Sequence, residues 1–166
     1  MSAPIYTGGR PFFKGGIRTK LNLVPSGATT VTLTKSKSNG VFLFDQATAG
    51  VAYTLPVPVS GLVYTFMSTV LQTAGTQKVI TGSASIFLTG AIQMYSGEAV
   101  SPSGTLGPFQ FNSPLASTFV TFTMNGTTQG GGIGTEVTFV GVSATSWLVY
   151  GTVVSPSGNL ATPFTV

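Results

Sequence analysis

The strongest constraint on the fold is a succession of short β-forming runs separated by turns that contain Gly and Pro. Val, Ile, Thr, Phe and Tyr dominate these runs, and such side chains pack well on a pleated, half-buried surface. Residues 118–124 and 136–142 alternate between apolar and polar types with the period of two that half-buried strands show. Further strands are predicted at residues 30–34, 41–44, 62–70, 78–81, 85–89 and 147–154.

Turn chemistry separates the predicted strands. Asn39-Gly40, Asn125-Gly126 and the glycine-rich residues 130–134 supply positions where tight turns need a positive φ. No window shows an amphipathic helical stripe with caps. Eight or more short strands predict a sandwich, a jelly roll or a barrel. We therefore predict an all-β protein: a single β-barrel or jelly-roll-like sandwich domain over residues 21–166, with an extended N-terminal arm over residues 1–20.

The surface of this domain is expected to be nearly neutral. Only 6% of the 166 residues are charged, although 42% are hydrophobic, and an average soluble domain carries roughly 25% charged residues. Such a surface leaves free monomers little charge to keep them apart. This is expected of a subunit that partners cover, or of an exposed shell or fibre component. Both interpretations are structural.

Cysteine is absent, so the sequence contains neither a disulfide framework nor a thiolate metal site. No secretory signal is visible at the start, which favours folding in the cytoplasm. No run approaches the ~18 apolar residues that a membrane-crossing helix needs. We therefore expect a soluble chain without a membrane partner.

Basic residues are concentrated near the start of the chain. Of the seven Lys and Arg residues, six lie within residues 1–37, where no acidic residue occurs. Residues 1–20 also contain glycine pairs and the adjacent rings of Phe12 and Phe13, without a periodic pattern. This combination is typical of an extended arm.

Three interpretations of this arm remain open. It is a solvated tail, as chain ends often are, or it lies across an acidic partner surface and becomes ordered on binding. Nucleic-acid binding is the third, although four basic residues are few for that role. The adjacent phenylalanines favour a protein partner, because covering apolar rings lowers the free energy. The residues predicted to contact the partner are Arg10, Phe12, Phe13, Lys14, Arg18 and Lys20.

Few residues could carry out catalysis. The chain has no His, which removes the commonest general base and the commonest metal ligand. Its three carboxylates, Asp45, Glu98 and Glu136, fall in different predicted segments, so no acid–base pair is indicated. Residues 130–134 lack the Lys and Ser or Thr that end a phosphate-binding loop. We therefore predict no enzyme activity, no cofactor, no metal and no small-molecule substrate.

Four segments carry a resemblance to a known family. Tyr-Thr-Leu-Pro-Val-Pro-Val-Ser-Gly-Leu-Val-Tyr-Thr-Phe at 53–66 is followed by Lys-Val-Ile-Thr at 78–81, Ile-Phe-Leu-Thr-Gly at 86–90 and Trp-Leu-Val-Tyr-Gly at 147–151. This order is similar to that in the small decoration (cement) proteins of tailed-bacteriophage heads. There, a Thr-Leu-Pro…Gly-x-x-Tyr-x-Phe segment precedes an Ile-containing strand pair, and a late Trp-x-Val-x-Gly strand closes the domain. The resemblance covers roughly residues 40–151.

The resemblance implies a structural virion protein, usually a homotrimer, on the outer surface of the capsid. There it would bind the major capsid protein and hold neighbouring subunits together against the pressure of the internal DNA. The chain departs from the family pattern in its basic N-terminal segment, in a Pro- and Gly-rich insert at residues 102–114 and in the tail after residue 151. These departures leave open where on a capsid the protein would sit.

The alternative function is that of a tail-fibre domain or another carbohydrate-binding β-domain, which shares the β-rich, weakly charged composition. Exposed aromatic rings would then bind sugars. Trp147 is the only Trp, but it lies within a predicted strand, where packing in the core or at its rim is the usual role. A sugar-binding role therefore stays open.

Overall fold

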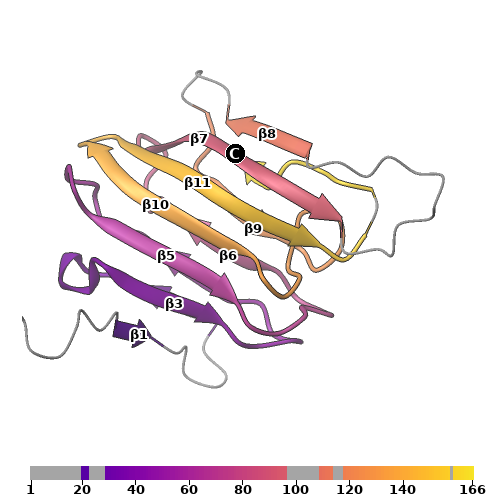
Figure 1. Ribbon diagram of the computed structural model, residues 1–166. Helices are drawn as coiled ribbons and strands as arrows, with labels where there is room; N and C mark the ends of the chain where they lie inside the picture. Colours follow the sequence, from indigo (N-terminus) through magenta and orange to yellow (C-terminus); the bar gives the residue numbers. More distant parts are fainter. Residues whose placement is uncertain (1–19, 23–28, 97–108, 114–117, 158) are drawn as a thin grey trace, which may run out of the picture.

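The computed structural model describes residues 20–22, 29–96, 109–113, 118–157 and 159–166. These residues form twelve strands and the short 3-10 helix η1 (Lys35–Lys37), arranged as Figure 1 shows. No helix in these ranges is both long enough and apolar enough to cross a membrane. The strands are β1 (Lys20–Asn22), β2 (Thr30–Thr32), β3 (Gly40–Phe44), β4 (Ala52–Thr54), β5 (Val63–Ser68), β6 (Gln77–Ile80), β7 (Phe87–Ser96), β8 (Phe109–Ser113), β9 (Thr121–Met124), β10 (Glu136–Ser143), β11 (Ser146–Ser155) and β12 (Phe164–Thr165).

Two sheets pack face to face. The larger sheet has the strand order β1-β3-β5-β10-β11-β7-β8, and the smaller sheet has the order β12-β9-β6-β4-β2. Figure 1 shows the larger sheet in front, with β6 and β9 of the smaller sheet behind it. The predicted all-β sandwich is confirmed. Within the described residues both sheets are open, so they do not close into the barrel that the prediction also allowed.

Both sheets mix parallel and antiparallel strand pairs. The parallel pairs are β1–β3, β3–β5 and β7–β11 in the larger sheet, and β2–β4 and β4–β6 in the smaller one. Antiparallel pairs join β10 to both β5 and β11, so the β10–β11 hairpin occupies the middle of the larger sheet. Parallel neighbours require long connections. The chain makes these connections by crossing to the other sheet and back, for example between β4 and β5 and between β6 and β7.

The alternating sequence pattern determines which side chains face the core. Along β5, Tyr64, Phe66 and Ser68 are buried, while the residues between them are only partly covered. The Tyr53 ring, from the smaller sheet, meets the Phe66 ring edge-on with the centroids 5.0 Å apart. Trp147 is fully buried and packs edge-on against Tyr64. Aromatic rings from both sheets therefore interlock at the centre of the sandwich, where such pairs add to the free energy of burial.

One glycine permits the close pairing of β7 and β11. Gly90 has φ +123° and lies opposite Val149 in the parallel register. A Cβ atom built at this position would overlap the carbonyl oxygen of Val149. Glycine is required here for two independent reasons, because its backbone adopts the positive φ freely and because it has no side chain to collide.

Candidate functional site

The predicted arm is mostly outside the described residues. Arg10, Phe12, Phe13, Lys14 and Arg18 all lie outside them, so their role as partner contacts stays a prediction. The backbone of Lys20 begins β1, where it pairs in parallel with Gly40.

One end of the sandwich gathers four connections, and we call it the loop end. It consists of residues 34–39, 57–62, 83–86 and 142–146. Main-chain hydrogen bonds hold these segments together: Asn39 N–H donates to Val63 O at 2.7 Å, and Gly61 N–H donates to Gly141 O at 3.0 Å. Phe87 N–H donates to Thr145 O at 2.9 Å. Because paired strands anchor every segment, the loop end is a defined surface.

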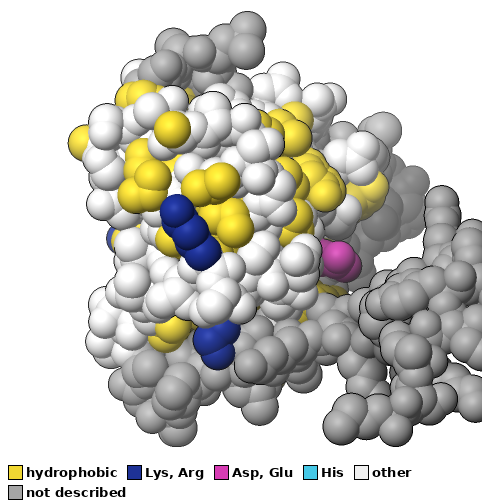
Figure 2. Space-filling model, turned by 90° about the vertical axis from the view of Figure 1, so that its left-hand side faces the viewer, with side chains coloured by type: hydrophobic (Ala, Val, Ile, Leu, Met, Phe, Trp, Pro, Cys, Tyr) yellow, Lys and Arg dark blue, Asp and Glu magenta, His cyan; other side chains and the backbone are white. Residues whose placement is uncertain are grey.

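The loop end presents apolar side chains beside basic ones. Val57, Val59 and Val142 are 58%, 46% and 46% exposed, although Val is usually a buried residue. The adjoining helix η1 carries Lys35 and Lys37, both exposed. Figure 2 looks onto this end, where dark blue basic side chains lie among yellow hydrophobic ones. None of the four loop-end segments contains an acidic residue. This surface therefore suits a partner surface that is partly apolar and partly acidic.

A second feature is a shallow hollow on the outer face of the larger sheet, which we call the sheet hollow. Its volume is about 430 Å³. It lies over the end of the β10–β11 hairpin away from the turn, where Glu136 is opposite Thr152 and Thr138 is opposite Tyr150. The lining residues are Gly134, Glu136, Thr138, Tyr150, Gly151 and Thr152.

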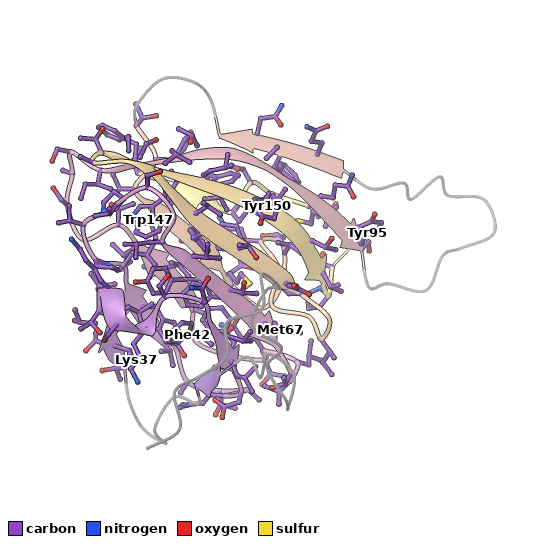
Figure 3. The ribbon with its side chains drawn as sticks, turned by 60° about the vertical axis from the view of Figure 1, so that its left-hand side comes forward. Lys37, Phe42, Met67, Tyr95, Trp147 and Tyr150 are labelled. Carbon is purple, nitrogen blue, oxygen red and sulfur yellow. The ribbon has the colours of Figure 1, made fainter. Side chains whose placement is uncertain are left out.

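Alternation along the two strands aims these polar side chains outward. The adjacent residues Val137, Phe139 and Val149 point the other way and are buried in the core. Tyr150 is 49% exposed, and its neighbour across the strand pair on the β7 side is the small Ala91. The ring of Tyr150 therefore remains accessible at the surface. Figure 3 places Tyr150 along β11 and Tyr95 near the end of β7.

Charge is almost absent from this face. Glu136 is the one charged residue among strands β3, β5, β7, β8, β10 and β11. Within the described residues, neither the Glu136 carboxylate nor the Thr152 hydroxyl has a hydrogen-bond or ion-pair partner. Thr138 Oγ1 lies 3.1 Å from Thr65 Oγ1 on β5, with which it shares a hydrogen bond. The hollow therefore combines the exposed ring of Tyr150 with a carboxylate and a threonine hydroxyl, Glu136 and Thr152, that have no partner among the described residues.

Sequence reasoning considered Trp147 as the aromatic candidate and overlooked Tyr150. The structure puts Trp147 in the core and Tyr150 on the surface. The period-two pattern of β11 contained the necessary signal, since residues an odd number of positions apart on a strand point to opposite faces. Glu136 and Tyr150 lie on the two different strands of the β10–β11 hairpin, and only the register of these strands brings them to one site.

Within the described part of the chain, the carboxylates form no candidate metal centre. The described residues contain no group of three or more His, Cys, Asp or Glu side chains that could hold a metal ion. Asp45 acts on a buried tyrosine: burial raises the pKa of Tyr53, and the nearby Asp45 carboxylate raises it further. Glu98 lies outside the described residues.

Comparisons of this chain with protein families, with curated proteins and with solved structures find no match.

Proposed function

We propose that this chain is a structural virion protein, a capsid decoration protein that binds the outer surface of a phage head and stabilises contacts between major capsid subunits. The observation that carries this proposal is the loop end, where Val57, Val59 and Val142 are exposed beside Lys35 and Lys37. In this proposal the protein acts as a homotrimer, without enzyme activity, cofactor or metal.

The position of the resemblance supports the proposal. Val57 and Val59 belong to the segment at residues 53–66 that resembles head decoration proteins, and this segment leads from β4 through the loop end into β5. The remaining segments of the resemblance contribute to β6, β7 and β11. The residues that carry the likeness thus contribute to the scaffold and include two of the three exposed valines, Val57 and Val59.

The energetics require several copies to act together. Covering a valine side chain contributes about 1.5 kcal/mol or more, and three valines alone fall well short of stable binding after the entropy of association is lost. A standard interface buries ~1,600 Å² in total. A trimer that presents three equivalent loop ends would gain the missing affinity through avidity. Because it binds the assembled shell and not free subunits, it would stabilise the shell by mass action.

The experiment is a cosedimentation assay with heads that lack the protein, taken from the virus whose genome encodes the chain. We expect wild-type protein to pellet with the heads, and the combined Val57→Ser, Val59→Ser and Val142→Ser variant to stay in the supernatant. The matched control combines Leu71→Ser and Ile133→Ser, two residues that are 43% and 62% exposed at the opposite end of the sandwich. This control should pellet like wild type.

Two results would contradict the proposal. The first is wild-type protein that fails to pellet with its own heads, and the second is a loop-end variant that pellets as well as the control. Light scattering behind a sizing column tests the trimer separately. We expect a mass of about three times 17.0 kDa, and a monomer on the heads as well as in solution would exclude the trimer.

A further inference from the structure

We propose that the sheet hollow is a binding site for a neutral saccharide, with the ring of Tyr150 as its platform and Glu136 and Thr152 as its hydrogen-bonding groups. This inference is independent of the proposed function, because the hollow lies on the outer face of the larger sheet and shares no residue with the loop end.

The first argument is the chemistry of the lining. A pyranose ring is amphipathic, with C–H groups on its faces and hydroxyl groups around its edge. Tyr150 offers an accessible aromatic face, and aromatic side chains bury a large area at a small cost in conformational entropy. The carboxylate of Glu136 accepts hydrogen bonds, and the hydroxyl of Thr152 both donates and accepts them. Both groups are without protein partners among the described residues, so they are available to sugar hydroxyls.

The second argument concerns charge. Because Glu136 is the single charged residue on strands β3, β5, β7, β8, β10 and β11, the hollow carries a negative charge and no cation on these strands neighbours it. Phosphate, sulfate and uronate groups would be repelled. A hydroxyl donated to a carboxylate forms a short, charge-assisted hydrogen bond. The site therefore favours a ligand rich in hydroxyl groups and free of negative charge.

The third argument is preorganisation. The strands that carry the hollow are anchored from the other side of the sheet, where Val137, Phe139 and Val149 are fully buried in the core. Gly151, on the rim, has φ +146°, and a Cβ atom there would overlap the carbonyl oxygen of Glu136. The backbones of β10 and β11 are thus in close contact beneath the site. Side chains on rigid strands lose little further freedom when a ligand binds.

The surface beside the hollow has room for more than one sugar unit. Gln93 on β7 lies opposite Thr152, and Tyr95 lies two residues further along the same strand. The Tyr95 hydroxyl donates to Gln93 Oε1 at 3.1 Å, which orients the amide. Among the described residues the Nε2 group of Gln93 has no acceptor, so it can donate to a ligand. Tyr95 is opposite Val154, so its Cα is about 14 Å from that of Tyr150 by strand geometry. The two rings would hold different units of one oligosaccharide.

Isothermal titration and saturation-transfer NMR test this on the full chain. The probes are maltotetraose, cellotetraose, chitotetraose and mannotetraose, with tetragalacturonate as the anionic counterpart. We expect at least one neutral probe to bind with a Kd of about 1 mM or tighter, and tetragalacturonate not to bind. Tyr150→Ala should weaken binding by about tenfold. Glu136→Gln should weaken neutral binding less and lessen the exclusion of the anionic probe.

The matched control is Leu148→Ala, because Leu148 is exposed on the same strand and face but lies outside the hollow. It should bind like wild type, as should the loop-end variant with three serines. The proposal is overturned if no neutral probe binds, if only tetragalacturonate binds, or if Tyr150→Ala and Leu148→Ala have equal effects. If the protein binds a neutral sugar but does not bind heads, the saccharide site is supported and the proposed function is excluded.

Discussion

The hydroxyl of Tyr53 donates a hydrogen bond to the main-chain carbonyl of Leu43, 3.2 Å away, and so joins β4 of the smaller sheet to β3 of the larger one. The tyrosine is buried, and burial together with the Asp45 carboxylate raises its pKa. Burial also raises the pKa of Tyr64, whose hydroxyl donates to Thr34 O at 3.0 Å. Both tyrosines therefore link protonation to stability.

Alkaline pH should destabilise the fold through Tyr53. Its pKa in the folded protein lies above the value of about 10 in the unfolded chain. Its contribution is therefore fully present below about pH 10, and it is lost as the pH rises through the pKa of the folded state. Urea denaturation between pH 8 and about 11.5 should show a falling free energy of unfolding. Tyr53→Phe should cost about 1 kcal/mol at pH 8, through the lost hydrogen bond, and should decline less steeply above pH 10. Parallel pH profiles for the two proteins would contradict this.

Gly90→Ala should be among the most damaging single-methyl additions to this chain. It combines the strain of a positive φ, about 1–2 kcal/mol, with the overlap against Val149 O. Gly61→Ala is the matched control, because Gly61 has φ +90° but no atom within 4 Å of its added Cβ. We expect Gly61→Ala to cost about 1 kcal/mol and Gly90→Ala to cost at least about 3 kcal/mol in urea denaturation. Equal costs for the two variants would show that the backbones of β7 and β11 shift easily to make room for the added Cβ atom.

Trp147 should report on the core alone. As the only Trp, and one that is fully buried, it should emit at short wavelength and resist quenching by acrylamide until the protein unfolds. Its Nε1 has no hydrogen-bond partner within the described residues, so Trp147→Phe removes an unsatisfied polar group as well as apolar contacts. We expect Trp147→Phe to cost less than about 2 kcal/mol, and Trp147→Ala about 3–5 kcal/mol. Strong quenching in the native protein would disprove the burial.

The lysines of η1 should govern the rate of attachment to heads. Replacing Lys35 and Lys37 by Gln should slow association and weaken its dependence on salt, because rim charges act mainly on encounter. Surface plasmon resonance on immobilised heads at two ionic strengths measures both effects. Lys78→Gln, on β6 of the smaller sheet, is the control and should behave like wild type. An unchanged association rate for the double variant would show that the lysines of the loop end do not take part in the encounter with heads.

Local patterns predicted most strands but not their partners. Each of the eight predicted runs overlaps a strand, because β-branched and aromatic residues bounded by turn residues favour strands even where the alternation is incomplete. The segments missed were β1, β4 and β12, which have only two or three residues each, and β8, whose Gln110 and Asn112 weaken the β-forming pattern. The parallel pairs were also not predicted, since the period of two identifies a face of a strand but not its neighbour.

The candidate sites depended on information that the sequence does not contain. Lys35 and Lys37 were visible as charges, but long-range strand pairing is what puts them at the same end of the sandwich as Val142. Glu136 and Tyr150 appear as unrelated residues until the hairpin register brings them to one face. The predicted arm residues from Arg10 to Arg18 stay a prediction, because they lie outside the described part of the chain.

The central position of the β10–β11 hairpin has a consequence for biogenesis. During translation, β1, β3 and β5 are made before β7 and β8. In the finished sheet β5 and β7 are not neighbours, because the later β10–β11 hairpin lies between them. The ribosome must therefore deliver most of the chain before the larger sheet can become continuous. Such high contact order slows folding and leaves unpaired strand edges exposed to other nascent chains. Truncated products that end before residue 136 should consequently aggregate rather than accumulate as a smaller domain.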